Sequence, residues 1–203
     1  MARRPGEIGR TESGAAGLLR FDEVARPALT RATRRLPALT GETIRVQFHP
    51  ALTIIGGKLQ SGRQAGTEVH AASYLTERRM VLDSELLCYP SELRRILIHE
   101  LFHFVWRRLG NPKRLAWEEV LRRECKDKAK GELGWSAEWR KDAMRPSDVQ
   151  NRTLRWRHYV CESFCDTAAW LWGPPHAQHT LAARFRNRRK LWFQGIATNP
   201  LSI

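Results

Sequence analysis

The sequence predicts an α+β fold in which a small, mostly antiparallel sheet packs on two core helices. Residues 44–48 alternate apolar and polar side chains, which is typical of a strand with one buried face. Residues 96–106 are apolar almost all round a helix, a pattern typical of a helix inside a core. A second apolar helical stretch, at 160–171, provides a partner for the first.

Length and composition indicate one folded domain. The chain has 203 residues, of which 42% are hydrophobic and eight are tryptophans, enough for a sizeable core. We expect a single domain over residues 15–195, a flexible segment over 1–14, which is polar and contains glycine, and a C-terminal tail over 196–203.

Two features predict a cytoplasmic protein. No stretch has the apolar length of a membrane span, and basic residues in 1–14 lack the apolar core of a secretory signal behind them. In that compartment the cysteines are expected to be reduced thiols; they are Cys88, Cys125, Cys161 and Cys165.

The net charge of +14 makes nucleic acid a possible partner, and residues 184–190 concentrate it. Arginine far outnumbers lysine, a bias that GC-rich coding also produces, so nucleic-acid binding is not favoured. The positive field favours acidic partners without identifying one.

The first half of the chain reads as a helix followed by strands. Apolar residues recur at helical spacing over 15–36, with a bend or break expected at Pro27. Strands are predicted at 44–48 and 52–55, and a glycine-flanked loop at 62–66.

Two further short strands, at 71–75 and 80–82, precede the first core helix. Ser91 is a suitable N-cap for that helix, which we expect to run to Leu109 and end at Gly110.

The second half is predicted to be helical. One helix follows Asn111 and reaches about Lys128, and a connector occupies 130–146. A long helix then covers 147–172, and a last basic helix covers 178–193.

The first core helix contains the pattern His-Glu-x-x-His. His99 and His103 are four residues apart and therefore lie above one another on one helix face, where both imidazoles can bind one metal ion. Glu100 lies beside that face, within reach of a metal-bound water. The pattern predicts a Zn²⁺ site in a dry environment, which strengthens the acidification of such a water.

A catalytic zinc site needs a third protein ligand. In metzincins, glycine and histidine follow the second histidine at the third and sixth positions, which Trp106 and Leu109 occupy here. Glu162 and Asp166, one turn apart in the second core helix, form a carboxylate pair among apolar residues. A zinc ion and an imidazole N–H would offset the cost of burying them.

His-Glu-x-x-His followed by Glu-x-x-x-Asp resembles the gluzincins, the thermolysin- and neprilysin-like zinc metallopeptidases. The resemblance covers residues 80–172 and is closest to minimal single-domain gluzincins with a zincin-like fold. It implies that Glu162 is the third zinc ligand and that Asp166 holds the first histidine, His99. It further implies hydrolysis of a peptide or protein substrate, with Glu100 as general base.

Some roles stay open in the sequence. His158, one turn before Glu162, is a rival ligand or a residue lining the site. The group that stabilises the oxyanion has no motif; Tyr159 is the first choice, and His158, His176 and His179 are alternatives. The resemblance also implies an edge strand for substrate, expected within 74–82.

Two other functions are compatible with the same motifs. The chain could be a latent or non-catalytic zincin, a regulatory or binding module in which a terminal helix covers the cleft. It could also be a nucleic-acid-associated peptidase, given the basic stretch at 184–190. Substrate specificity and oligomeric state are not encoded in any recognisable pattern.

Overall fold

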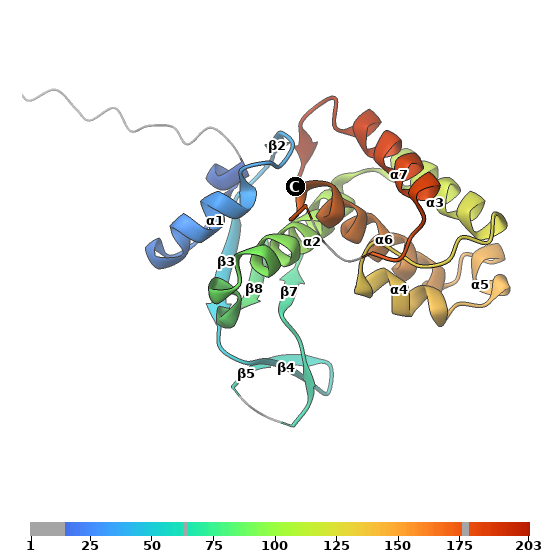
Figure 1. Cartoon of the computed structure of the whole chain (residues 1–203). Helices are drawn as coiled ribbons and strands as arrows, with labels where there is room; N and C mark the ends of the chain where they lie inside the picture. Colours follow the sequence, from blue (N-terminus) through green and yellow to red (C-terminus); the bar gives the residue numbers. More distant parts are fainter. Residues whose placement is uncertain (1–14, 63–64, 176–178) are drawn as a thin grey trace, which may run out of the picture.

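The computed structural model describes residues 15–62, 65–175 and 179–203 and has an α+β architecture (Figure 1). The predicted flexible segment 1–14 and the predicted start of the last helix at Gln178 lie outside these residues. A four-stranded sheet lies on one side of the first core helix, and further helices lie on the other side (Figure 1). The sheet has the order β1 (Leu19–Arg20), β3 (Ile44–His49), β8 (Arg79–Asp83) and β7 (Ala71–Tyr74).

This sheet is mixed, so the prediction of a mostly antiparallel sheet is wrong for it. β1 and β3 are parallel, β3 and β8 are parallel, and β7 alone runs antiparallel, to β8. Alternating side chains predict that one face of a strand is buried, but they do not encode the direction of the neighbouring strand.

The chain between β3 and β7 forms a separate three-stranded antiparallel sheet, the lobe at the bottom of Figure 1. It consists of β4 (Leu52–Ile55), β5 (Lys58–Ser61) and β6 (Thr67–Glu68). Gly56 and Gly57 connect β4 to β5 with φ values of 55° and 77°, the left-handed geometry that a tight hairpin requires.

The two core helices are α2 (Pro90–Arg108) and α6 (Leu154–Trp172), and they pack directly on each other. The rings of Phe102 on α2 and Phe164 on α6 lie 5.9 Å apart between centroids, and both side chains are fully buried. Helix α2 begins at Pro90, one residue before the predicted cap, because proline fits the first turn, where no N–H partner is needed. The prediction of a buried helix here is confirmed.

Residues 15–36 do not form one helix. Two 3₁₀ turns, Ala15–Leu18 and Glu23–Ala25, flank β1, and α1 (Arg26–Thr33) follows. Pro27 lies in the first turn of α1, so it starts the helix and does not bend one.

The remaining helices are α3 (Asn111–Lys126), α4 (Trp135–Asp142), α5 (Pro146–Gln150) and α7 (Ala183–Ile196). Helix α4 lies inside the segment predicted as a connector. The helix predicted over 147–172 is divided between α5 and α6, and Arg152 between them has a φ of 48°, which no continuous helix allows.

The C-terminal residues belong to the folded domain. β9 (Leu201–Ser202) pairs in parallel with β2 (Leu39–Thr40), and the side chains of Leu201 and Ile203 are buried. The Ile203 amide also donates to the carbonyl of Thr40 (2.9 Å). The segment 196–203 is therefore not a loose tail. None of the described helices is both long enough and apolar enough to span a membrane.

A buried ion cluster holds α7 against the rest of the helices. The Arg189 guanidinium, fully buried, lies 2.6 Å from a carboxylate oxygen of Glu124 and 2.6 Å from one of Glu132. Burial opposes ionisation of Glu132, but Arg189 outweighs it and lowers the pKa of Glu132 to about 2. The hydroxyl of Tyr159 donates to the same carboxylate (2.5 Å).

We predict that Arg189→Met lowers the free energy of unfolding by about 3–5 kcal/mol, because it leaves the buried Glu124 without a cation and Glu132 with Lys141 alone. Urea unfolding followed by tryptophan fluorescence measures this change. Arg188→Met is the matched control: Arg188 is 40% exposed, and its pair with Asp127 contributes less than about 1 kcal/mol. Equal effects of the two substitutions would contradict the role given to the buried cluster.

Candidate metal centre

His99 and His103 occupy successive turns of α2 and point to the same side of it, as their spacing predicts. Their Nε2 atoms lie 3.2 Å apart. His99 is buried and His103 half-buried, so both imidazoles are largely shielded from water.

Helix α6 brings Glu162 to these two nitrogens. Its Oε2 atom lies 3.2 Å from His99 Nε2 and 4.0 Å from His103 Nε2. A tetrahedral zinc ion with bonds of about 2.0–2.1 Å holds its ligand atoms about 3.3–3.5 Å apart. Two imidazole nitrogens and a carboxylate oxygen are a donor set that zinc accepts. Two of their three separations are close to this range, and the third, 4.0 Å between Glu162 and His103, is longer.

Asp166, one turn after Glu162, fixes the orientation of His99. The Nδ1 of His99 lies 2.8 Å from Asp166 Oδ1 and donates to it, which leaves the lone pair of Nε2 for a metal. The other oxygen of Asp166 accepts a hydrogen bond of 2.8 Å from the Ala137 amide at the start of α4. A Cβ atom at Gly134 would lie 2.3 Å from the Asp166 carboxyl carbon, so only glycine allows this close approach.

These carboxylates change the pKa of His99. Burial lowers the pKa of this imidazole, but Asp166 and Glu162 together outweigh burial and raise it well above its usual value. For Glu162, a carboxylic acid, burial acts in the opposite direction and raises the pKa. The two histidines and Arg140 outweigh burial and bring the pKa of Glu162 to about 2. Without metal, these contacts therefore favour the protonated form of His99.

Arg140 is a residue of this site that the sequence did not identify. Its guanidinium lies 3.4 Å from Glu162 Oε1. The other oxygen of this carboxylate, Oε2, is the one next to the two histidines. Arg140 also donates to the Ser136 carbonyl (2.7 Å) and stacks on the Trp139 ring, 4.3 Å from its centroid. No motif signals this role, because Arg140 lies in a segment that was predicted as a connector.

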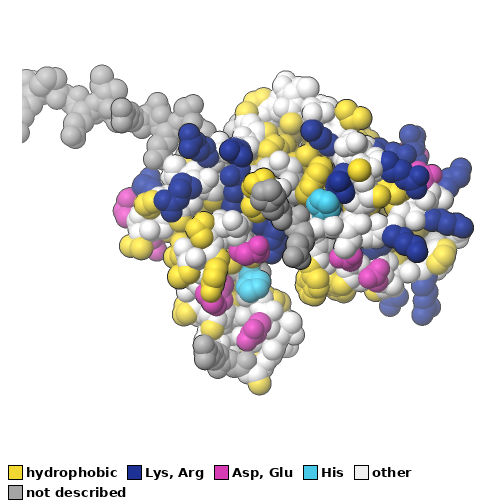
Figure 2. All heavy atoms as spheres, in the orientation of Figure 1, with side chains coloured by type: hydrophobic (Ala, Val, Ile, Leu, Met, Phe, Trp, Pro, Cys, Tyr) yellow, Lys and Arg dark blue, Asp and Glu magenta, His cyan; other side chains and the backbone are white. Residues whose placement is uncertain are grey.

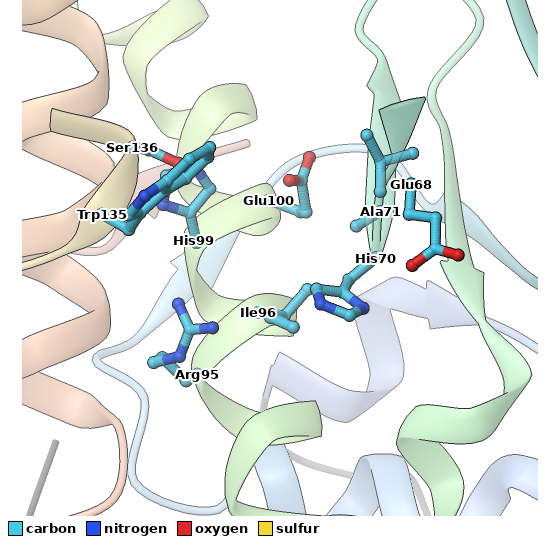
Figure 3. A pocket seen from close by; sticks show the side chains of 10 residues that line it. Glu68, His70, Ala71, Arg95, Ile96, His99, Glu100, Trp135 and Ser136 are labelled. Carbon is cyan, nitrogen blue, oxygen red and sulfur yellow. The ribbon is translucent and has the colours of Figure 1, made fainter. Parts of the chain in front are cut away.

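Glu100 extends from α2 into the space between that helix and the strand that carries Ala71 (Figure 3). Its Oε2 accepts a hydrogen bond of 2.7 Å from the hydroxyl of Ser73 on β7. A pocket of about 450 Å³ opens beside it. The pocket is lined by Glu68, Val69, His70, Ala71, Arg95, Ile96, His99, Glu100, Trp135 and Ser136.

The opposite edge of the His103 ring faces two thiols. The Sγ atoms of Cys161 and Cys165 lie 3.5 and 3.4 Å from His103 Nδ1. A hydrogen bond from Cys165, assisted by His103, lowers the pKa of the Cys161 thiol to about 6 against the effect of burial. Burial keeps the pKa of Cys165 well above its usual value. The sequence predicts both only as reduced thiols, because no metal-binding motif includes them.

The structure separates the other predicted residues from this cluster. Tyr159, the first choice for contacting the oxyanion, lies outside the cluster: its side chain is fully buried and its hydroxyl donates to Glu132. His158 is exposed and belongs to neither group of potential ligands in the described chain. His179 is exposed and contacts Arg186 and Trp170. His176 lies outside the described residues.

No protein-family model, no curated protein and no solved structure matches this chain. The function must therefore be argued from the geometry of the residues themselves.

We predict that Asp166→Asn weakens zinc binding by about 10–100-fold, the usual effect of losing the carboxylate that orients a ligating histidine. Competition with a chromophoric chelator measures the affinity. The control is Asp142→Asn, an exposed aspartate of α4, which should leave the affinity unchanged. An Asp166→Asn protein with unaltered zinc affinity would show that His99 needs no such support.

Zinc affinity should also depend on pH. Because the pKa of His99 is raised in the metal-free protein, zinc must displace a proton at every pH below that value. The pKa of His103 is raised as well, so the affinity is expected to fall at least about tenfold for each pH unit that the solution is acidified. Zinc titrations from pH ~8 to ~6 test this slope, and His158→Asn, at an exposed histidine, should not alter it. A flat profile would exclude proton displacement.

Proposed function

We propose that this chain is a zinc-dependent metallopeptidase of the gluzincin type, which hydrolyses a peptide or protein substrate. One observation carries the proposal: His99, His103 and Glu162, from two helices about sixty residues apart, present their donor atoms within 4.0 Å of one another. Glu100 lies beside them in the wall of a pocket, where a substrate can enter.

When bound, zinc would supply a Lewis acid and an acidified water. Glu100 then acts as general base, taking the proton of the attacking water and delivering it to the leaving amine. The hydroxyl of Ser73 donates to Glu100 Oε2 and thereby leaves Oε1 to handle that proton. Ser73 is a positioning residue in this mechanism.

Arg140 replaces Tyr159 as the candidate for stabilising negative charge. The Arg140 side chain is 25% exposed, and its guanidinium carries a permanent positive charge next to the proposed ligand Glu162. A cation at this place favours the ionised form of Glu162 and the charge that develops on a tetrahedral intermediate.

The strand next to Glu100 is suited to bind an extended substrate. In the described chain β7 forms a ladder with β8 only, so its other edge offers backbone donors and acceptors for strand addition. The edge strand was expected within 74–82, but β8, which fills most of that range, is internal. The proposed docking strand is thus Ala71–Tyr74.

Latency through a terminal helix has less support than an open site. The lining of the pocket comes from 68–71, α2 and the start of α4, and none of it comes from α1 or α7 among the described residues. A latent or non-catalytic zincin would need another segment over the pocket.

Nucleic-acid association also has less support. Lys and Arg side chains lie over the helices on the right of Figure 2 and also on its upper left, away from the lower lobe. Within α7, however, Arg189 is buried with Glu124 and Glu132, and Arg188 is paired with Asp127. The basic stretch is thus partly structural.

We predict that Glu100→Gln retains zinc and lowers peptide cleavage by at least about 10²-fold, since it removes the base and keeps the shape. Cleavage of a mixed peptide library by the zinc-loaded protein, followed by mass spectrometry, measures this loss. Glu119→Gln, at an exposed residue of α3, is the control that should cleave like the unaltered chain. Unchanged turnover in Glu100→Gln would remove Glu100 from the base role.

A further inference from the structure

Cys161 and Cys165 repeat on α6 the geometry that His99 and His103 have on α2. They are four residues apart, so both thiols project from one face. That face meets the Nδ1 edge of His103, which lies 3.5 Å from one sulfur and 3.4 Å from the other. The three atoms lie within 4.8 Å of one another.

The predicted zinc site does not use these sulfurs. Its contacts to His103 are made at Nε2, on the other side of the ring. A histidine that ligates a metal commonly donates its second N–H to a carboxylate, a backbone carbonyl or a water. His103 faces two thiols instead, a pair of soft donors that hydrogen bonding alone does not require.

We propose that His103 Nδ1, Cys161 Sγ and Cys165 Sγ form a second cation site, for a thiophilic ion such as Cu⁺ or Cd²⁺. In tetrahedral zinc sites, the reference for such a donor set, metal–sulfur bonds of about 2.3 Å and metal–nitrogen bonds of about 2.1 Å place S and N about 3.6 Å apart. The two measured N···S distances are close to this value. Thiolate donors select soft ions over Mg²⁺ or Ca²⁺.

Access and charge are compatible with binding. Cys161 is half-buried, so an ion from solvent can reach its sulfur. Cys165 is buried, so the surrounding side chains hold its sulfur in place. The ion binds the two sulfurs as thiolates and Nδ1 through its lone pair, so any protons on these atoms go to solvent and no redox step is involved.

This site deepens the proposed function, and its regulatory consequence rests on that function. His103 would share its imidazole between the two sites, so an ion at Nδ1 changes the donor strength of Nε2. Loading the thiol site is then expected to inhibit peptide cleavage. The binding itself does not require the chain to be a peptidase.

The test uses Cd²⁺ as probe, under reducing conditions, with the full chain carrying Cys88→Ser and Cys125→Ser. These substitutions leave Cys161 and Cys165 as the two remaining cysteines. Titration should produce a thiolate-to-cadmium charge-transfer absorption that saturates at one ion per chain. Elemental analysis after gel filtration counts the bound ions.

Two further variants separate the sites. His103→Gln should weaken the cadmium affinity measured by this absorption by at least about tenfold, since the loss of a direct ligand costs no less than the loss of its support. Cys161→Ser is a small change at a half-buried position, and with it the charge-transfer absorption should no longer saturate at one cadmium ion per chain. This variant provides the test if His103→Gln fails to fold. Glu162→Gln should leave the absorption intact while weakening the zinc site.

The proposal is overturned if stoichiometric Cd²⁺ gives no such absorption, or if folded His103→Gln binds cadmium with unchanged affinity. Failure of the peptidase proposal would look different: cadmium would still bind at the thiols, while the zinc-loaded chain would cleave no peptide.

Discussion

The contact between His99 Nδ1 and Asp166 Oδ1, 2.8 Å long and buried between α2 and α6, is the constraint on which the rest of the site depends. It ties the two core helices at a fixed point and selects the tautomer that leaves His99 Nε2 free for a metal. Asp166 is itself held by the Ala137 amide, so α4 enters the same arrangement and carries Arg140 to Glu162. Packing, tautomer and charge therefore come from one crossing of helices.

Local helix geometry made much of the site predictable. The four-residue spacings of His99 with His103 and of Glu162 with Asp166 each define one helix face, and the structure brings those faces together. The buried helix at 96–106 and the α+β class follow from periodicity in the same way.

The parts that the sequence missed depend on tertiary placement. Tyr159 lies three residues before Glu162, but this spacing does not encode that the Tyr159 hydroxyl donates to Glu132, the carboxylate that also pairs with Arg189. Strand direction, the pairing of β9 with β2 and the approach of Ser73 to Glu100 are set by long-range contacts that alternation cannot encode. The thiols come to lie beside His103 only through the packing of α6 on α2, which the sequence does not encode locally.

The described part of the chain has two groups of donor atoms for a metal ion. One consists of imidazoles and a carboxylate, and the other of an imidazole and two thiols. Zinc X-ray absorption of the chain loaded with a single equivalent of zinc tests the central claim most directly. The account predicts nitrogen and oxygen neighbours at about 2.0–2.1 Å, with the imidazole scattering of two histidines. A zinc–sulfur distance near ~2.3 Å as the main contribution would contradict it, because the ion would then lie at the cysteines.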